Sequence, residues 1–329
     1  MNPTIRDVSK LSGVSTATVS RTFFYPERVK KATREKVLEA ARVLNYSPNA
    51  IARAMALQRT DKIAFLICKA HSSILDEFYA GICEGIMKES NAYDYQLLIS
   101  TEEDWIAATN SAKRKQIEGV ILGGNAKAER VLEFQNQNIH VVMVNNRIAG
   151  MNLPYVLSDE RDGTRQAVQH LVERGHQKIA MIAGRFSPYI CSERYNAFLD
   201  AMNEHGLKVE SRYIRMSDPN IESAVEVATA LLRQKDPPTA IFGANDVIAV
   251  GAIKAALRLG LRIPRDVAIV GYDDSSICCT TEPELTSVHI DRMRMGQICV
   301  QKLQALMRGE EIPEQVTVLP TWLNVRGSS

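Results

Sequence analysis

The chain has 329 residues, of which 45% are hydrophobic and 24% are charged. This composition predicts a soluble globular protein long enough for two or three domains. No stretch approaches the roughly 18 apolar residues of a membrane span, and the N-terminus lacks the basic flank and apolar run of a signal peptide. We therefore expect a protein that stays in the cytoplasm and has no membrane partner.

Charge is divided unevenly along the chain. Residues 1–60 contain 11 Lys or Arg against 4 Asp or Glu, whereas the remaining residues contain 29 against 34. The first segment therefore has a net charge of +7 and the rest a net charge of −5. A basic head on a mildly acidic body is typical of a small polyanion-binding module fused to a larger domain with another task.

The sequence gives little support to cofactor or metal chemistry. The six cysteines show no C-x-x-C spacing, which argues against a zinc site, a redox pair or a disulfide framework. The P-loop, G-x-G-x-x-G, H-E-x-x-H and G-x-S-x-G patterns are all missing from the sequence. We expect no cofactor, no metal and no enzymatic activity.

The N-terminal segment predicts three short helices. Thr4 and Asp7 have the spacing of a capping box at the start of the first helix. After a break, Ser15 can cap a second helix that runs from Thr16 to about Phe23. A third helix is expected over about residues 32–44. The tight turn between the first two helices gives the spacing of a helix-turn-helix unit.

In such a unit the second helix enters the major groove of DNA, and exposed side chains near its N-terminal end touch base edges. We therefore expect Thr16, Ala17 and Arg21 to read bases, and Arg21 can contact guanine through two hydrogen bonds. A second group of residues is expected near the phosphates, where contacts fix register without reading sequence; it comprises Thr4, Ser15, Ser20, Lys30 and Asn49. The alternative is a three-helix interaction domain without a DNA role.

Four runs in this segment follow one known pattern almost position by position. They are TIRDV at 4–8, GVSTATVSR at 13–21, TREKV at 33–37 and LNYSPN at 44–49. This pattern resembles the head of the lactose/galactose repressor (LacI/GalR) family of transcriptional regulators.

Three residues depart from the family pattern, because Phe24, Lys30 and Met55 stand where the family usually has Asn, Ser or Thr, and Leu. The first departure puts the family's contact at position 24 in doubt. Lys30 is a poor N-cap, so the third helix loses on the order of 1 kcal/mol of capping, while the lysine offers a cation to a phosphate.

Residues 50–57, AIARAMAL, favour a helix of only about two turns. Isolated helices shorter than roughly 12–15 residues are marginal in water, so we expect this hinge to fold only against a second copy and against DNA. The resemblance implies that paired hinge helices lie in the minor groove through Ala52 and Met55. The side chain at position 55 would then enter the central base step and kink the duplex.

From Asp61 onward, short β-branched runs alternate with amphipathic helical stretches. The runs lie at 63–68, 96–100, 120–122, 141–144, 179–182, 240–242 and 267–270. This alternation predicts βαβ units around parallel sheets. A segment of about 270 residues suits two lobes with a ligand cleft between them.

The resemblance continues through the body in several motifs. They include DGTR at 162–165, AND at 244–246, GYDD at 271–274 and LTSV at 285–288. The resemblance implies an α/β protein in which a small all-α helix-turn-helix head precedes a two-lobed, periplasmic-binding-protein-like body. Each lobe would have a doubly wound parallel sheet, and the chain would cross between the lobes three times.

Polar side chains at the carboxyl ends of strands face the cleft in such a fold, and sugar hydroxyls need both donors and acceptors. By match to the family, Asp273, Arg194 and Asn245 are the strongest expected effector contacts. Asn145 and Arg147 rank next, after the run at 141–144. The N-lobe wall is expected to include His71, Ser72 and Phe78, the last of which offers an aromatic face to a sugar ring.

Structural alternatives stay open for several of these residues. Asp273 could be a turn carboxylate, Arg194 part of a salt bridge, and His71 an ordinary loop histidine. Arg292 replaces the neutral residues often found at its crossover. If Arg292 faces the cleft, it favours an acidic sugar or a sugar phosphate as the effector, and otherwise it belongs to a solvated crossover.

These observations predict a DNA-binding head at 1–46, a hinge at 47–59 and an effector-binding and dimerisation domain at 60–329. The N-lobe is expected at about 60–160 and 290–319, and the C-lobe at about 161–289 and 320–329. The expected protein is a homodimer, or a dimer of dimers, that binds a pseudo-palindromic double-stranded operator.

The expected function is repression of genes for carbohydrate uptake or catabolism, under allosteric control by a sugar or a sugar derivative. Two alternatives from other classes remain. One is a sugar-binding protein that serves a transporter and has no DNA role. The other is a two-lobed sugar kinase or dehydrogenase, which the missing nucleotide-binding loop does not support.

Overall fold

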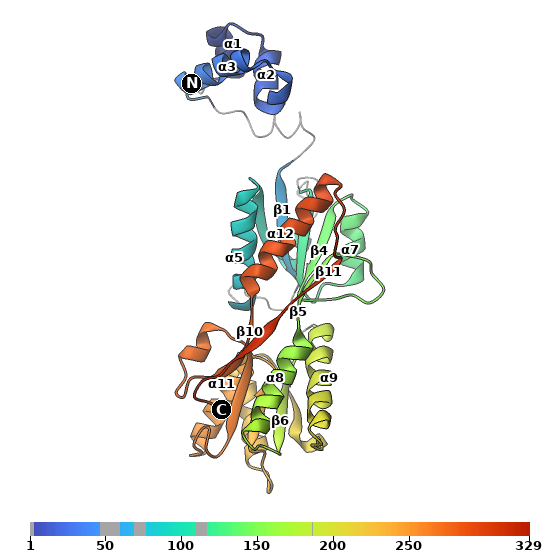
Figure 1. Cartoon of the computed structure of the whole chain (residues 1–329), viewed down its shortest axis with the longest axis vertical. Coiled ribbons are helices and arrows are strands. Elements are labelled where there is room, and N and C mark those ends of the chain that lie inside the picture. The colour runs from blue at the N-terminus through green and yellow to red at the C-terminus, as the bar shows by residue number, and fades with distance from the viewer. Residues whose placement is uncertain (1–2, 47–59, 69–76, 109–116, 186) are drawn as a thin grey trace. The chain divides into compact units, whose positions relative to one another are not determined.

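The computed structural model describes residues 3–46, 60–68, 77–108, 117–185 and 187–329 (Figure 1). The chain divides into two compact units. The head unit contains residues 1–62 with 115–118, and the body unit contains 63–114 with 119–329. Within the described ranges, no helix combines the length and the apolar character needed to span a membrane.

Over residues 3–46, the head unit has three α-helices and one 3-10 turn. They are α1 (Ile5–Ser12), α2 (Thr16–Phe24), η1 (Pro26–Arg28) and α3 (Lys31–Val43). Apolar side chains from all three α-helices form one small core that consists of Val8, Val19, Val37, Ala40 and Ala41. The three expected helices are present close to their expected bounds, and the turn at Pro26–Arg28 was not expected.

Local hydrogen bonds explain where these helices begin and end. The Asp7 carboxylate accepts from the Thr4 backbone N–H at 2.9 Å and from the Thr4 hydroxyl at 2.7 Å, which fixes the start of α1. Gly13 ends α1 with a φ of +70°, a conformation that glycine adopts without strain. The Ser15 hydroxyl accepts from the Thr18 N–H at 3.2 Å and so caps α2. As expected, Lys30 makes no side-chain cap for α3.

Sheet A of the body has six strands in the order β11-β5-β4-β3-β1-β2. They are β1 (Lys62–Cys68), β2 (Gln96–Thr101), β3 (Gly119–Gly124), β4 (His140–Val144), β5 (Tyr155–Ser158) and β11 (Val316–Leu319). Its helices are α5 (Glu77–Ala92), α6 (Glu102–Ala108), α7 (Ala128–Gln135) and α12 (Arg292–Arg308). We call sheet A with these helices the N-lobe.

Sheet B has six strands in the order β12-β10-β9-β8-β6-β7. They are β6 (Ile179–Gly184), β7 (Ile214–Ser217), β8 (Ala240–Gly243), β9 (Ala268–Asp273), β10 (Thr286–Ile290) and β12 (Thr321–Asn324). Its helices are α8 (Glu160–Glu173), α9 (Pro188–Glu204), α10 (Ile221–Leu232) and α11 (Asp246–Arg258), with short turns at η3 (Ser211–Tyr213) and η4 (Ser276–Cys279). We call sheet B with these helices the C-lobe.

Both faces of sheet B are buried under helices. In β6, Met181 and Ala183 belong to the same core cluster as α8 and α9 residues, whereas Ala180 and Ile182 belong to the cluster that contains α10 and α11 residues. Successive side chains on a strand point to opposite faces, so a strand covered on both sides must be apolar throughout. This requirement explains the unbroken apolar runs in the sequence.

The sheets differ from the sequence-based expectation in two ways. All seven expected strands are present, but β5, β7, β10, β11 and β12 were not predicted, because each is short and contains polar residues that interrupt its apolar run. In addition, β12 pairs antiparallel to β10, so sheet B is not wholly parallel. The antiparallel strand results from the return of the chain to sheet B after Pro320.

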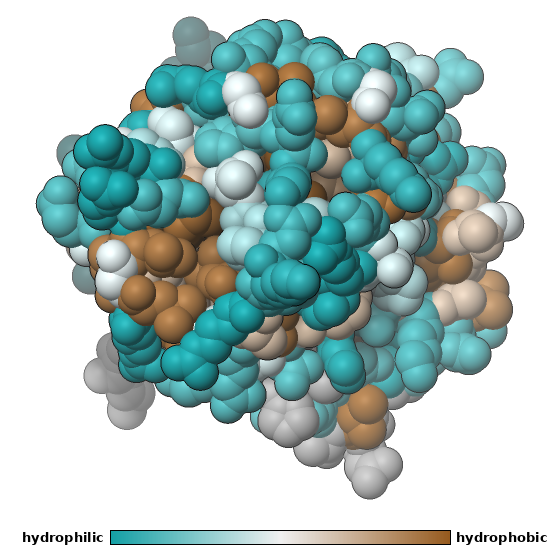
Figure 2. Space-filling model, turned by 90° about the horizontal axis from the view of Figure 1, so that it is seen from below, coloured by the Kyte–Doolittle hydropathy of each residue, from teal (hydrophilic) through white to brown (hydrophobic). Residues whose placement is uncertain are grey.

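The surface is mainly polar. Figure 2 shows one face of the molecule, on which hydrophilic residues predominate and hydrophobic residues form separate groups. The exposed large apolar side chains of the C-lobe are Tyr195, Met216, Leu257, Trp322 and Val325. Isolated exposed apolar residues of this kind are normal on a folded protein and call for no partner.

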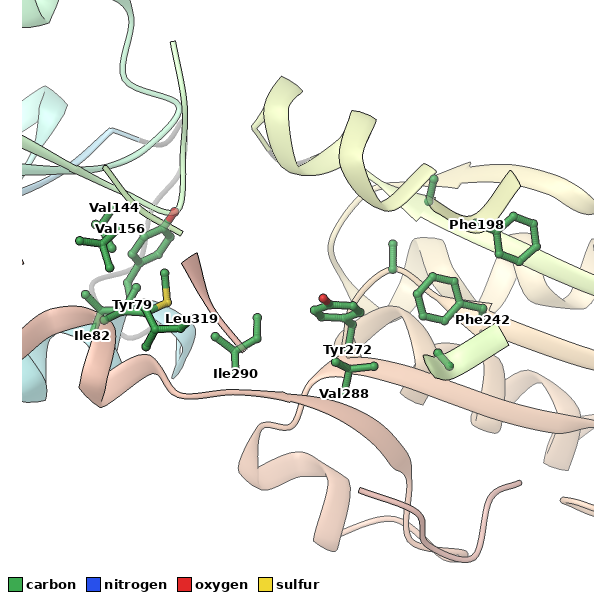
Figure 3. Packing of buried hydrophobic residues seen from close by; sticks show 14 of the residues in the cluster. Tyr79, Ile82, Val144, Val156, Phe198, Phe242, Tyr272, Val288, Ile290 and Leu319 are labelled. Carbon is green, nitrogen blue, oxygen red and sulfur yellow. The ribbon is translucent and has the colours of Figure 1, made fainter. Parts of the chain in front are cut away.

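The chain passes between the sheets three times, as expected. It leaves sheet A after β5, leaves sheet B after β10, and leaves sheet A again after β11. One buried apolar cluster continues across these crossings, from Tyr79 and Val144 in the N-lobe to Tyr272 and Phe242 in the C-lobe (Figure 3). The carboxyl ends of β5 and β10 therefore lie where the two lobes meet, and we call this region the lobe junction.

Candidate DNA-binding surface and effector site

The first half of α2 is the candidate surface for base contacts. Thr16, Ala17 and Arg21 are all exposed, and Ser20 is half-buried. Ala17 and Arg21 are four residues apart and therefore share one face of the helix. Thr16 and Ser20 are related in the same way. The helix thus presents one guanidinium, hydroxyls and a methyl group on its exposed surface.

Three of the residues expected near phosphates occupy equivalent places in the head unit. Thr4, Ser15 and Lys30 are the N-cap residues of α1, α2 and α3. Helix N-termini present free N–H groups and a positive partial charge, which favour phosphate oxygens. Thr4 and Ser15 already use their hydroxyls in capping. A phosphate could therefore be held there by backbone N–H groups as well as by side chains.

Five of the expected site residues lie outside the described residues. They are Asn49, Ala52 and Met55 of the head and hinge, and His71 and Ser72 of the N-lobe wall.

Arg194, on α9, is the centre of a buried ion-pair network. Its Nε donates to Glu160 Oε2 at 2.6 Å, its Nη1 donates to the Ala244 carbonyl, and its Nη2 lies 3.2 Å from Asp273 Oδ1. The guanidinium also stacks 3.7 Å from the centre of the Tyr272 ring. Burial alone would lower the pKa of Arg194, but the Glu160 and Asp273 carboxylates raise it above its ordinary value.

Asp273 ends β9 in an unusual backbone conformation. Its φ is +101°, and the φ of the following Asp274 is +50°. Residues other than glycine seldom adopt positive φ, and such outliers cluster at functional sites. Burial raises the pKa of Asp273 to about 7, against the opposing effect of Arg194. Near neutral pH its carboxyl group can therefore donate or accept a hydrogen bond, which suits a sugar hydroxyl.

Asn245 lies beside this network at the start of α11. Its Oδ1 caps the helix by accepting from the Ile248 N–H at 2.9 Å. The neighbouring Asp246 is buried and accepts from the Ser275 N–H at 2.7 Å and the Ser275 hydroxyl at 2.8 Å. The structure therefore brings Asn245, Arg194 and Asp273 together at the carboxyl ends of β8 and β9, as the sequence predicts.

The N-lobe contributes polar groups from the end of β4. Asn145 is buried with a φ of +51°, and among the described residues its Oδ1 has no hydrogen-bond partner. Arg147 is exposed, and its guanidinium lies 5.9 Å from the centre of the Tyr155 ring. Phe78 is half-buried near the start of α5 and packs edge-on against Tyr79 at 5.2 Å between ring centres.

A direct contact joins the two lobes, because the Glu77 carboxylate accepts from the Ser276 N–H at 2.6 Å and from its hydroxyl at 2.9 Å. Burial raises the pKa of Tyr189, on α9, to about 12, and the charge of Arg147 in the N-lobe acts in the opposite direction. The candidate effector residues therefore lie on both sides of the lobe junction.

Sequence reasoning missed two carboxylates of this region. Glu160 and Asp246 are both almost fully buried. Glu160 accepts from the predicted Arg194, whereas Asp246 accepts from Ser275 and from the Ser287 hydroxyl. Each lies within three residues after the end of a strand, whereas Asp273 is itself the last residue of β9. Placement just after a strand was therefore the sequence signal that could have identified both carboxylates. For Glu160 this signal was not usable, because the preceding strand β5 was not predicted. In the part of the chain that the structure describes, no cluster of His, Cys, Asp and Glu could hold a metal ion.

Comparisons with known proteins cover the whole chain. Residues 4–49 match the bacterial regulatory proteins of the lacI family, and residues 168–329 match the periplasmic binding protein-like domain. Catabolite control protein A of Priestia megaterium is 32% identical over 335 aligned positions and is covered completely, as is this chain. The repressor CytR of Escherichia coli (strain K12) is 30% identical over 99% of this chain and 96% of its own length.

Solved structures give the same result. The lac repressor dimer bound to operator and the anti-inducer ONPF has a TM-score of 0.83 at 26% identity, with 100% of this chain and 99% of that chain covered. A complex of the transcriptional regulator CelR with cellobiose has a TM-score of 0.75 at 30% identity, with 99% and 100% covered. These relatives are regulators, which favours the regulatory prediction over the transporter and enzyme alternatives. The chain belongs to the lacI family of bacterial regulatory proteins and is a DNA-binding transcriptional regulator.

Proposed function

We propose that the chain represses genes for carbohydrate uptake or catabolism, and that a sugar or sugar derivative bound at the lobe junction sets its affinity for operator DNA. The observation that carries this proposal is the placement of Arg194, Asp273 and Asn245 together at the carboxyl ends of neighbouring strands. The same chain carries an exposed α2 in its head. The CelR relative is a complex with cellobiose, which supports a sugar-type ligand.

The proposal assigns a task to each segment. Residues 1–46 bind DNA, residues 47–59 form the hinge, and residues 60–329 bind the effector and a second copy of the chain. Thr16, Ala17 and Arg21 read bases, and the N-caps of the three head helices contact phosphates. A homodimer fits a pseudo-palindromic operator, because each head then reads one half-site.

Coupling between the effector and DNA needs a firm connection at the start of the N-lobe. The backbone N–H groups of Thr60 and Asp61 both donate to the Glu118 carboxylate, the second at 2.9 Å. This contact ties the residues that follow the hinge to the segment that enters β3. A change in lobe arrangement on effector binding would then move the hinge starts of the two copies. Such coupling is reciprocal and typically amounts to about 1–3 kcal/mol.

Selection from random duplex DNA at a fixed, near-physiological salt concentration tests this function. The full-length protein should enrich a pseudo-palindrome with a flexible pyrimidine–purine step at its centre. Addition of a sugar should then change the affinity for the selected operator. Binding that stays sequence-independent, both alone and with a panel of sugars, would contradict the proposal.

Replacement of Arg21 by Ala tests the base-reading assignment. We expect operator affinity to fall by about 1–3 kcal/mol, and the preference at one base pair of each half-site to relax, because a bidentate contact to guanine is lost. Arg42→Ala is the matched control, because Arg42 is an exposed head arginine that pairs with Glu39 at 2.9 Å on α3. An Arg21→Ala protein that selects the wild-type operator sequence would show that another residue reads the base.

A further inference from the structure

Arg292 occupies a confined place at the lobe junction. It is the first residue of α12 and follows the crossing from β10. A Cβ added at Gly81 of α5 would lie 3.1 Å from Arg292 Cβ and 3.3 Å from Arg292 Nε. The glycine on α5 thus leaves the space that the Arg292 side chain fills. The side chain is therefore directed along the N-lobe helices rather than away into solvent.

The guanidinium of Arg292 is only partly satisfied. Its Nη2 donates to the Asp274 carbonyl of the C-lobe at 3.2 Å. Its Nη1 is buried and has no hydrogen-bond partner among the residues that the structure describes. A buried charged donor without an acceptor is costly, because its lost hydration is not replaced. Within the described part of the chain, no side chain or carbonyl supplies an acceptor for this nitrogen.

The nearby carboxylates are already engaged by other groups. Asp273 pairs with Arg194 at 3.2 Å. Asp274 pairs with His289 and Arg326, at 2.8 and 2.7 Å. The carboxylate of the neighbouring Asp291 accepts from the Arg294 N–H at 2.9 Å as the cap of α12. Arg292 therefore makes no ion pair with these three carboxylates within the described residues, although its positive charge acts on Asp273 from a distance and opposes the rise that burial causes in the pKa of that carboxyl.

A second group at the junction also lacks a partner. Asn145 Oδ1 is buried at the end of β4 without a hydrogen-bond donor from the described residues. Considering the described residues alone, the junction therefore offers a cationic donor on Arg292 and a neutral acceptor on Asn145 that lack hydrogen-bond partners. A molecule that carries an anionic group and hydroxyl groups would supply both missing partners.

We infer that Arg292 binds an anionic group of the effector, so that the ligand is a sugar acid or a sugar phosphate rather than a neutral sugar. The inference rests on the proposed function, because it names the ligand of the same site. A carboxylate or a phosphate oxygen would accept from Nη1, and a hydroxyl of the same molecule would donate to Asn145. Arg292 is then the residue that distinguishes acidic from neutral sugars.

A matched set of ligands tests the inference in the full-length protein. Glucose, glucuronate and glucose 6-phosphate differ only at carbon 6, and the galactose and mannose series supply the same comparison. We expect one or more acidic members to raise the melting temperature and to bind in calorimetry, whereas the neutral member of the series does not. The carboxylate and phosphate arms show which anion the site takes.

Variants of Arg292 then connect the anion to this residue. Arg292→Gln should weaken the acidic ligand about 30-fold or more, the range found when one partner of a buried charge pair is removed. Arg292→Lys should retain part of the affinity, because it keeps the charge. Arg294→Gln is the control, because Arg294 is an exposed arginine on the same helix and its loss should leave binding unchanged. Unliganded melting temperatures check that each variant folds.

Failure of the inference can be told apart from failure of the proposed function. A neutral sugar that binds better than its acidic relatives, or an Arg292→Gln protein that binds the acid like wild type, would overturn the inference while the regulator remains sugar-controlled. If no sugar in any series binds, the anion inference and the sugar effector are both wrong. Loss of specific operator binding in the wild type would instead contradict the DNA-binding part.

Discussion

Asp274 shows how a single carboxylate joins several elements at one edge of sheet B. Its side chain accepts from Asn324 Nδ2 at 2.7 Å, lies 2.8 Å from His289 Nδ1, and pairs with Arg326 Nη2 at 2.7 Å. These partners come from β10, from β12 and from the residues after β12. Burial would raise the pKa of Asp274, but these three groups lower it to about 2. The charged form is therefore the one that stabilises the fold.

Asp274→Asn should lower the free energy of unfolding at neutral pH by about 2–3 kcal/mol, the value of a pKa depressed by roughly two units. Asn tolerates the positive φ at this position, so the change tests charge rather than backbone strain. Because the folded-state pKa is depressed, the contribution is present above pH 4 and is lost as the pH falls toward 2. The difference between wild type and variant in urea unfolding should therefore shrink over that range.

Asp266→Asn provides the comparison for this measurement. Asp266 pairs with Arg262 at 2.7 Å, and the pairing lowers the pKa of Asp266, but Arg262 is exposed and Asp266 is partly exposed. Ion pairs that water and salt can reach contribute little to the free energy of unfolding, because they are screened. A loss at Asp266 as large as the loss at Asp274 would show that the partners of Asp274 are not what stabilises this edge of sheet B.

At the scale of elements, α5 and α12 approach each other closely enough for their backbones to touch. A Cβ added at Gly296 would lie 2.1 Å from the Ile82 carbonyl oxygen, and one added at Gly85 would lie 2.0 Å from the Met293 carbonyl oxygen. Only glycine fits at these two positions. The close contact brings the start of α12, and with it Arg292, against α5.

Gly296→Ala should lower the stability of the body unit by about 2 kcal/mol, because the added methyl group meets backbone that no rotamer change can move. Alanine gains about 1 kcal/mol of helix propensity over glycine, so the net loss is smaller than the steric cost alone. Thermal unfolding followed by circular dichroism measures the change. Gly81→Ala, whose nearest neighbour is a side chain at 3.1 Å, should melt close to wild type. Equal melting temperatures for all three proteins would mean that the helices can separate.

The elements of the fold follow from the sequence to different degrees. The head helices were predictable because their caps at Thr4, Ser15 and Gly13 are local signals. Strands covered on both faces, such as β6, were predictable because they are continuous apolar runs. The short strand β7 contains Arg215 and Ser217 among its four residues. It is a strand because it pairs with β6, which lies about 30 residues earlier in the chain. The local sequence pattern carries no information about such pairing.

At the scale of the whole molecule, the sequence predicts those site residues that can be identified from their place near the end of a strand. Asp273, Asn245 and Asn145 lie at or within two residues of the carboxyl end of a strand, and the structure places them at the lobe junction. The network itself was not predictable, because the Glu160–Arg194 bond joins residues 34 positions apart and needs the tertiary fold. The placement and hydrogen bonding of the Arg292 side chain likewise depend on Gly81 and Asp274, which are far from Arg292 or from each other in the sequence.

The N-lobe also carries the surface that best explains a dimer. Leu98 and Ile99, both 38% exposed, lie on β2, which is the edge strand of sheet A among the described residues, and Met87 is 50% exposed on α5. Helix α5 contacts β2. Apolar side chains gathered at a sheet edge are a site for association, whereas scattered apolar residues are not. We propose that a second copy of the chain covers this patch.

Ile99→Asp should therefore convert the dimer to monomers in sedimentation velocity, because two buried carboxylates would face each other across a two-fold interface. Operator affinity should fall by about 100-fold or more, since two linked heads bind a two-part site far more tightly than one head does. Val318→Asp is the matched control, because Val318 is a 49% exposed valine on β11, the opposite edge of the same sheet. If Val318→Asp dissociates the dimer and Ile99→Asp does not, the interface lies at the other edge.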